Sequence, residues 1–279
     1  MSPIITPNQL IEAVQTNAIV LVDATNSPTA YQNYQHSHLQ GALFVDVNFQ
    51  LADINEDVSI GGRHPLPTAE EFSKTLSDLG ITPETWVVVY DDKNGANAAA
   101  RFWWMLRSIG HQKVQVLSGG IQAGIQAGFP SSSIVEVPNK VSSYPIQNWQ
   151  WPTIDLQGMD EMILKDNFIV IDVREPQRFK GETEPIDLVA GHIPGAINIP
   201  FTTNLDENGF ILSPEELKEK YQKAFENIDS DNRVVHCGSG VTACHTLLAM
   251  TVAGLSLPKL YVGSWSEWSR NNREIIVEQ

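Results

Sequence analysis

Cysteine is scarce in this chain: Cys237 and Cys244 are the two cysteines among 279 residues. If both lay on one helix, their Cα atoms would be about 10 Å apart, which exceeds the roughly 7 Å that a disulfide can bridge. We therefore expect no disulfide, as is usual for proteins of a reducing compartment. The sequence also lacks the Cys-x-x-Cys and His-x-x-x-His spacings of zinc sites, so we expect no bound metal.

Positive charge is also scarce, because 18 Lys and Arg residues stand against 33 Asp and Glu residues, for a formal net charge of −15. This balance argues against a nucleic-acid partner, and it means that an anionic substrate needs a local cationic site. The first basic residue is Arg63, so the N-terminal region lacks the basic segment of a secretory or transit peptide. Since no apolar run approaches the ~20 residues of a membrane span, we expect a cytoplasmic protein that binds no membrane.

An internal repeat organises the sequence. Residues 18–47 and 167–201 each contain an apolar run that ends in Asp, a polar segment, a His-x-x-Gly-Ala motif and a second apolar run. Residues 85–120 and 231–265 each read as strand, loop, helix and strand, with Gly near the end of the helix. We therefore expect two tandem copies of one fold.

Each copy alternates strand and helix patterns, which favours an α/β fold with a largely parallel sheet. Helix-start signals, a Ser or Thr followed by Glu, open residues 68–80 and 213–225. A segment rich in Pro, Ser and Asn separates the two copies. We place the first copy at residues 1–138, the linker at 139–152 and the second copy at 153–279.

The segment RVVHCGSGVTACH places Cys237 where an apolar strand passes into a helix, which we expect to begin near Val241. The two glycines after the cysteine let the backbone curl tightly, so that successive N–H groups turn toward the sulfur. Ligands bind at this edge of open α/β sheets, and the helix N-terminus adds partial positive charge that favours a thiolate. The candidate substrate-binding residues of this anion cradle are Gly238, Gly240, Val241 and Thr242.

Three interpretations fit a cysteine in this setting. A buried structural cysteine is the simplest, but the glycine-rich passage from strand to helix favours chemistry for Cys237, whereas Cys244 lies in an apolar helical stretch and is expected to pack. Phosphoryl transfer needs an arginine six residues after the cysteine to bind the phosphate, and Ala243 stands there. Sulfur transfer needs only a thiolate that accepts sulfur as a persulfide, with no metal and no organic cofactor. The residues favour sulfur transfer.

The motifs VIDVRE, GHIPGAINIPF, CGSGVTACH and GSW, in this order, resemble those of the tandem-domain sulfurtransferases of the rhodanese family. The resemblance extends over nearly the whole chain and implies two rhodanese-like domains, each a mostly parallel sheet flanked by helices. It also implies that the second copy carries the nucleophile Cys237 and that the first copy is catalytically inactive. In the first copy, Tyr90 and Asp91 stand at the positions of His236 and Cys237.

The same resemblance suggests a donor and a set of site residues. A Cys-Gly-Ser-Gly loop is typical of the members that use 3-mercaptopyruvate, and Cys-Arg-Lys-Gly of those that use thiosulfate, so we expect 3-mercaptopyruvate, with thiosulfate as the alternative. Arg178 matches the family arginine that contacts the anionic donor. Ser239 and His64 match the serine and histidine that protonate the product enolate in that family. The expected acceptors are cyanide and thiols, thioredoxin among them.

Two departures from the family pattern concern the donor. Asn48 stands where the family pairs an aspartate with the histidine, and an amide cannot stabilise an imidazolium as a carboxylate does. A second family arginine falls at Ile186 or Asp187, so its role is absent or supplied from elsewhere, with Arg63 as a candidate. A rival of another class is a non-catalytic rhodanese-fold binding module, which an intact cysteine loop argues against.

Other polar residues of these motifs are expected to serve the structure. Arg174 should form an internal ion pair with Glu175 or another nearby acid. His38 and His192 should form hydrogen bonds where the chain enters a strand. His236 neighbours the cysteine in sequence, but adjacent residues of a strand point to opposite faces, so it should not act as the catalytic base.

Overall fold

The computed structural model describes residues 1–278, which divide into two compact units. Unit 1 consists of Met1–Ala52, Pro67–Trp151 and Leu205–Ile211. Unit 2 consists of Asp53–Leu66, Pro152–Asn204 and the residues from Leu212 on. The segment Asp53–Leu66 therefore belongs by its contacts to unit 2, although it lies in the first part of the sequence.

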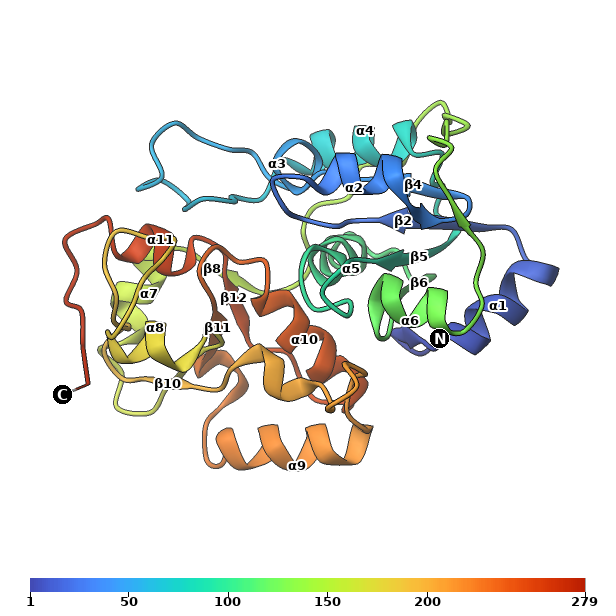
Figure 1. Ribbon diagram of the computed structural model, residues 1–279. Coiled ribbons are helices and arrows are strands. Elements are labelled where there is room, and N and C mark those ends of the chain that lie inside the picture. The colour runs from blue at the N-terminus through green and yellow to red at the C-terminus, as the bar shows by residue number, and fades with distance from the viewer. Residues whose placement is uncertain (279) are drawn as a thin grey trace. The chain divides into compact units, whose positions relative to one another are not determined.

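Unit 1 contains a five-stranded sheet in the order β1-β6-β5-β2-β4, in which neighbouring strands are parallel (Figure 1). Its strands are β1 (Ile4–Ile5), β2 (Ile19–Asp23), β4 (Ala42–Phe44), β5 (Trp86–Tyr90) and β6 (Val114–Leu117). A short antiparallel pair joins β3 (His38–Leu39) to β7 (Ser131–Ser132). The helices are α1 (Pro7–Thr16), α2 (Ala30–His36), α3 (Val47–Gln50), α4 (Ala69–Asp78), α5 (Ala98–Ser108) and α6 (Gly120–Gln126).

Unit 2 repeats this design with a parallel sheet in the order β10-β9-β11-β12-β8 (Figure 1). Its strands are β8 (Thr153–Ile154), β9 (Ile169–Asp172), β10 (Ala196–Asn198), β11 (Arg233–His236) and β12 (Lys259–Tyr261). The helices are α7 (Leu156–Met162), α8 (Pro176–Lys180), α9 (Pro214–Ala224), α10 (Ala243–Val252) and α11 (Ser264–Trp268), with short 3₁₀ turns at Phe201–Asn204 and Ser230–Asn232. The expected pair of α/β copies is confirmed.

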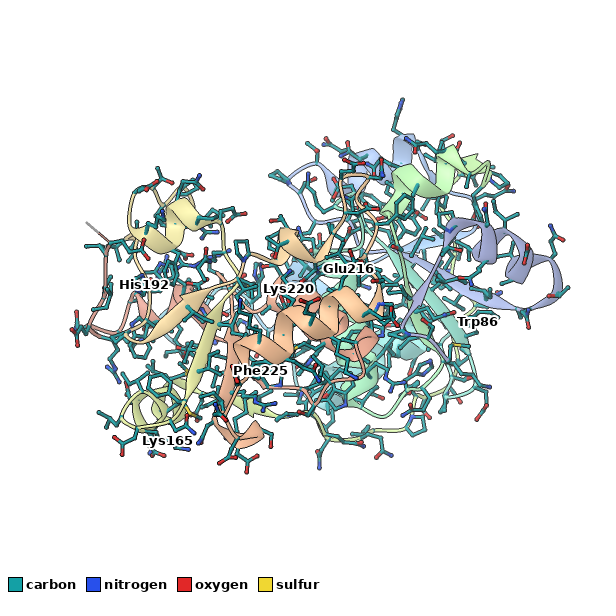
Figure 2. The ribbon with its side chains drawn as sticks, turned by 90° about the horizontal axis from the view of Figure 1, so that it is seen from below. Trp86, Lys165, His192, Glu216, Lys220 and Phe225 are labelled. Atoms are coloured by element: carbon teal, nitrogen blue, oxygen red, sulfur yellow. The ribbon has the colours of Figure 1, made fainter. Side chains whose placement is uncertain are left out.

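Both expected helix starts are confirmed by reciprocal capping. The Ser213 hydroxyl accepts a hydrogen bond from the Glu216 N–H, and the Glu216 carboxylate accepts one from the Ser213 N–H, so two donors at the start of α9 are satisfied. Thr68 opens α4 in the same way. Figure 2 shows Glu216 and Lys220 along α9, with Phe225 just beyond its end.

The apolar patterns of the sequence become two separate cores. In unit 1 the buried cluster includes Leu21, Val88, Tyr90 and Leu117, from three neighbouring strands. In unit 2 a second buried cluster contains strand residues and the two tryptophans of α11. Its members are Met159, Met162, Val170, Ile193, Val234, Tyr261, Trp265 and Trp268. No helix described within residues 1–278 is long and apolar enough to cross a membrane.

The strand register brings the repeated motifs to the same edge of each sheet. Asp172 at the end of β9 is paired with His236 at the end of β11, and Asp23 is paired with Tyr90 in unit 1. Cys237 in unit 2 and Asp91 in unit 1 therefore both follow the carboxyl end of a central strand. This is the edge at which open α/β sheets bind ligands.

Candidate functional site

Cys237 follows β11 directly and is anchored by its own backbone. Its N–H donates to the Ser264 hydroxyl at 3.3 Å, and its carbonyl accepts from the Trp265 N–H at 3.0 Å. The Gly238 carbonyl accepts from the Ser266 N–H at 2.9 Å. The first turn of α11, which is the Gly-Ser-Trp motif of the sequence, thus holds the start of the cysteine loop in place.

The cradle loop, residues 238–242, precedes α10, which begins at Ala243 rather than near Val241 as expected. The turn before the helix has i→i+3 hydrogen bonds, from the Cys244 N–H to the Val241 carbonyl and from the His245 N–H to the Thr242 carbonyl, so the regular helix begins after it. Gly240, before this turn, has φ +74°, a left-handed conformation that favours glycine. A Cβ atom on Gly240 would also lie 2.6 Å from the Val262 carbonyl oxygen. Glycine is therefore required at this position both by the backbone angle and by the space.

The cradle loop has the polar groups that an anion needs. Within the described residues, the N–H groups of Ser239, Val241 and Thr242 have no hydrogen-bond acceptor. Gly238 lies against guanidinium groups, because a Cβ atom there would be 2.8 Å from Arg63 Nη2 and 3.4 Å from Arg178 Nη2. The residue next to the cysteine is thus bordered by two positive charges in a chain that is strongly acidic overall.

Ser239 and His64 are in direct contact, with 2.7 Å between Ser239 Oγ and His64 Nδ1. Three hydrogen bonds fix the segment that carries the histidine onto α11 and the residues after it. The Arg63 N–H donates to Ser266 Oγ at 3.0 Å, and the Gly61 N–H donates to Glu267 Oε1 at 2.7 Å. The Asn271 side chain donates to the Ser59 carbonyl at 2.8 Å. The histidine is therefore positioned by backbone contacts of its own loop.

Asp187 is a fully buried carboxylate that binds three arginines. Arg63 donates from Nε at 3.1 Å and from Nη2 at 3.3 Å, Arg178 donates from Nη2 at 3.4 Å, and Arg270 donates from Nη1 at 3.0 Å. These arginines come from three distant parts of the sequence. From the sequence, Asp187 was expected only to mark the place of a missing arginine, and neither its contacts nor those of Arg270 were predicted. No local pattern in the sequence signalled these contacts, because the buried carboxylate of Asp187 lies between Ile186 and Leu188, which are exposed.

Arg178 is also bound by Glu184, whose oxygens lie 2.8 to 3.1 Å from its Nη2 and Nε atoms. Burial lowers the pKa of Arg178, but the hydrogen bonds and charge of Glu184, with Glu175 and Asp187 beyond it, outweigh burial and raise it. The guanidinium is therefore permanently charged and fixed in direction.

Arg174 forms the expected internal ion pair, but with other partners than Glu175. It contacts Asp172 at 2.6 Å and Glu184 at 3.2 Å, and its guanidinium carbon lies 4.4 Å from the Trp265 ring centroid. Burial raises the pKa of Asp172, but the nearby His236 and Arg174 charges and the Arg174 hydrogen bonds outweigh burial and lower it. Arg174 thus holds β9 to the segment that carries Glu184.

The three other histidines of the motifs lie where the sequence analysis expected them. His236 is buried, with Nε2 3.6 Å from Asp172, so its ring lies with the internal ion pair. His38 Nδ1 lies 2.6 Å from the Tyr34 carbonyl oxygen. His192 Nδ1 lies 2.8 Å from the Phe179 carbonyl oxygen, and its ring stacks on Phe179. Both of these contacts are structural.

In unit 1, Asp91 occupies the position that Cys237 has in unit 2, and its own carboxylate fills the loop that follows. Oδ1 accepts from the Lys93 and Gly95 N–H groups at 2.9 and 2.8 Å. Oδ2 accepts from the Asn97 and Ala99 N–H groups at 2.9 and 3.1 Å. The loop of the first copy thus retains inward N–H groups, but an internal anion already binds them.

Asn48 lies in α3 of unit 1, where its N–H donates to the Asp46 side chain at 2.7 Å.

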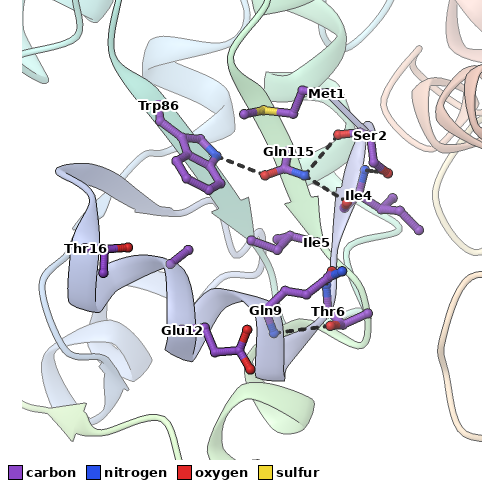
Figure 3. A pocket seen from close by; sticks show the side chains of 11 residues that line it. Met1, Ser2, Ile4, Ile5, Thr6, Gln9, Glu12, Thr16, Trp86 and Gln115 are labelled. Carbon is purple, nitrogen blue, oxygen red and sulfur yellow. Dashed lines mark hydrogen bonds between the residues drawn. The ribbon is translucent and has the colours of Figure 1, made fainter.

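A separate open pocket of about 600 Å³ in unit 1 lies at the N-terminal end of the chain (Figure 3). It is lined by β1 and α1 together with Trp86 and Gln115, whose side chains are hydrogen-bonded to each other. None of the candidate site residues lines this pocket.

The comparisons with known proteins agree with this geometry. A family model described as rhodanese-like domain matches this chain twice, over residues 6–127 and 155–271. A "probable 3-mercaptopyruvate sulfurtransferase" of Pseudomonas aeruginosa is 39% identical over 88% of this chain and 85% of its own length. A thiosulfate sulfurtransferase of Rattus norvegicus is 35% identical over 86% of this chain and 80% of its own length. The structure of a 3-mercaptopyruvate sulfurtransferase from Leishmania major superposes with a TM-score of 0.82 at 30% identity, covering 95% of this chain and 74% of that one.

Proposed function

The chain belongs to the rhodanese-like family and is a sulfurtransferase, and from this premise we propose that it moves a sulfur atom from 3-mercaptopyruvate to cyanide or a thiol through a persulfide on Cys237. The observation that carries the choice of donor is the contact between Ser239 and His64 beside the cysteine. A donor that leaves behind a carbanion needs such a proton-handling pair, and a donor that leaves behind sulfite does not.

In the first step the Cys237 thiolate attacks the sulfur of 3-mercaptopyruvate. The new S–S bond forms as the C–S bond breaks, and the electron pair of that bond remains on the organic fragment as the enolate of pyruvate. The N–H groups of the cradle loop stabilise negative charge on the sulfur, as preorganised backbone donors do for developing anions.

The enolate must then take up a proton to leave as pyruvate. The Ser239 hydroxyl and the His64 imidazole form a path for that proton, because each can pass one proton on while receiving another. The remaining proton of the persulfide is lost to solvent, which leaves Cys–S–S⁻ in the cradle loop.

In the last step the acceptor attacks the outer sulfur of the persulfide. The S–S bond breaks and its electron pair returns to Cys237 as a thiolate, so that the enzyme is ready for another donor. Cyanide gives thiocyanate, and a small thiol or a thioredoxin gives a new persulfide. The chemistry is nucleophilic throughout and no oxidant enters.

Arg63 and Arg178 are proposed to bind the donor carboxylate. Both guanidinium groups border Gly238. Each guanidinium has five N–H donors, so a donor carboxylate would bind those that Asp187 and Glu184 do not use. Arg63 would then supply the second positive contact that the sequence lacks near Ile186. The carboxylate would lie beside the loop while the sulfur faces the cysteine.

Thiosulfate is a second candidate donor, favoured by the number of guanidinium groups around Asp187, since a dianion gains more from positive charge than a monoanion does. Both donors use the same persulfide. They differ in the leaving group, because the sulfite released from thiosulfate needs no proton from Ser239.

The deciding experiment measures transfer to cyanide from 3-mercaptopyruvate and from thiosulfate, side by side, with the wild-type protein and with Cys237→Ser. We expect a higher kcat/KM for 3-mercaptopyruvate and no transfer by the variant, whose circular dichroism should match the wild type. A higher kcat/KM for thiosulfate would overturn the choice of donor, and near wild-type transfer by Cys237→Ser would overturn the mechanism.

A further inference from the structure

Building on the proposed function, we propose that Asp187 is a positioning residue that sets donor selectivity: it holds Arg63 and Arg178 beside Cys237 and makes the site favour a donor with one negative charge. Asp187 itself is not proposed to touch the donor. It acts through the arginines that it binds and through the charge that it cancels.

Asp187 lies beside the cradle loop, on the side of its arginines. Asp187 Oδ2 lies 3.7 Å from the place where a Cβ atom of Gly238 would be, so the carboxylate sits directly behind the two guanidinium groups that border the cradle loop. Arg63 binds it through two nitrogens, in the paired geometry that fixes a guanidinium in direction. Without a buried anion at this point, Arg63, Arg178 and Arg270 would repel one another at close range.

The carboxylates of this cluster cancel most of the positive charge of its arginines. Three guanidinium groups, those of Arg63, Arg178 and Arg270, face the two carboxylates of Asp187 and Glu184. A third carboxylate, that of Glu175, lies 3.5 Å from Arg178, but its side chain is about half exposed, so water and salt screen its charge. The buried groups of the cluster therefore have a single net positive charge. Arg174 also contacts Glu184, but its charge is balanced by that of Asp172, so this pair does not change the sum. One positive charge matches the carboxylate of 3-mercaptopyruvate and leaves one charge of thiosulfate unmatched.

The test changes that charge without changing side-chain size. Asp187→Asn keeps one oxygen for the arginines and raises the net charge of the cluster to two positive charges. We expect the ratio of kcat/KM for thiosulfate to kcat/KM for 3-mercaptopyruvate to rise at least about tenfold, and the KM for 3-mercaptopyruvate to rise. The KM for cyanide should stay unchanged, because cyanide reacts after the donor fragment has left.

A second variant changes the net charge of the cluster in the opposite direction. The test then does not depend on whether Asp187→Asn folds. Arg270→Gln removes one positive charge from the cluster and leaves both guanidinium groups at Gly238 in place, so the same ratio should fall. The matched control is Asp160→Asn, which breaks a pair with Arg273 that is about one-third exposed and lies elsewhere in unit 2, and it should leave the ratio unchanged.

A purely structural role for Asp187 would lower kcat/KM for both donors by one common factor. An unchanged ratio in both variants, with thermal unfolding showing folded protein, would therefore overturn the proposal. The ratio also separates this proposal from the proposed function. If the wild type itself prefers thiosulfate, the choice of donor fails, whereas the opposite shifts in the two variants still support or overturn the role of Asp187.

Discussion

His64 Nδ1 lies 2.7 Å from Ser239 Oγ, although 175 positions separate the two residues in the sequence. The contact depends on the loop around Gly62, where a Cβ atom would lie 2.3 Å from the Gly263 carbonyl oxygen, so glycine is required for the loop to approach α11. The tightly packed turn at Gly62 therefore allows two residues that are far apart in the sequence to lie in contact.

This contact predicts a donor-dependent effect of mutation. Ser239→Ala and His64→Asn should each lower kcat for 3-mercaptopyruvate by about 10²- to 10⁴-fold, the usual contribution of a positioned proton-transfer group. Transfer from thiosulfate should be reduced far less, since sulfite leaves without a proton. The double variant should be little worse than either single one, because the two groups act as a unit. Equal losses with both donors would argue that the pair only shapes the loop.

A second prediction concerns Gly240, for which the chain offers a matched control in Gly254. Both glycines have left-handed backbone angles, φ +74° and φ +68°, but a Cβ atom meets the Val262 carbonyl at 2.6 Å in the first case and nothing within 4 Å in the second. Each Gly→Ala change should cost about 1–2 kcal/mol for the backbone angle.

Gly240→Ala should in addition push the cradle loop away from β12 and reduce kcat/KM by at least about tenfold, because misplaced donors stabilise charge poorly. Gly254→Ala should leave kcat/KM unchanged. Urea unfolding and steady-state kinetics on the two variants check both statements. Full activity in Gly240→Ala would show that the loop position does not limit the reaction.

The sequence predicted the parts of the site that are local in the chain. Cys237, the glycines around it and the helix after it lie in one short segment, so strand, turn and helix signals were enough to place them. The resemblance to a known family added Ser239, His64 and Arg178, which no local pattern connects.

Asp187 shows why the rest could not be predicted. Its neighbours in the sequence are exposed apolar residues, so it resembles a surface acid. Its burial follows from contacts with Arg178, which is near in the sequence, and with Arg63 and Arg270, which come from distant segments. Likewise, nothing in the sequence indicated that Asp91 would turn its carboxylate onto the loop that follows it. Such roles depend on tertiary packing that pattern and spacing do not encode.

A third prediction concerns the buried ion pairs of Arg174. Arg174→Met would leave Asp172 buried without its arginine, while Glu184 would keep Arg178, and should lower the free energy of unfolding by about 3–5 kcal/mol. Arg273→Met is the matched control, because its pair with Asp160 is about one-third exposed on both sides. That change should cost less than about 1 kcal/mol. Chemical denaturation of both variants tests the contrast, and equal losses would contradict it.

The last prediction concerns Asp91 and its dependence on pH. Burial raises the pKa of Asp91 to about 6, although four N–H groups donate to the carboxylate and pull the pKa down. A carboxyl group whose pKa is higher in the folded state gives stability at low pH that is lost as the pH rises through the folded value. The wild-type protein should therefore lose this stability as the pH rises from about 4 to about 6.

Asp91→Asn removes the titrating group while preserving its shape, so the variant isolates this effect. The advantage of the wild type over the variant in free energy of unfolding should shrink by on the order of 3 kcal/mol between pH 4 and pH 7, as a shift of about two pKa units implies. Urea unfolding of both proteins at several pH values measures it. An advantage that grows with pH would mean that the four N–H groups outweigh burial, and that the loop after Asp91 stabilises the ionised carboxylate.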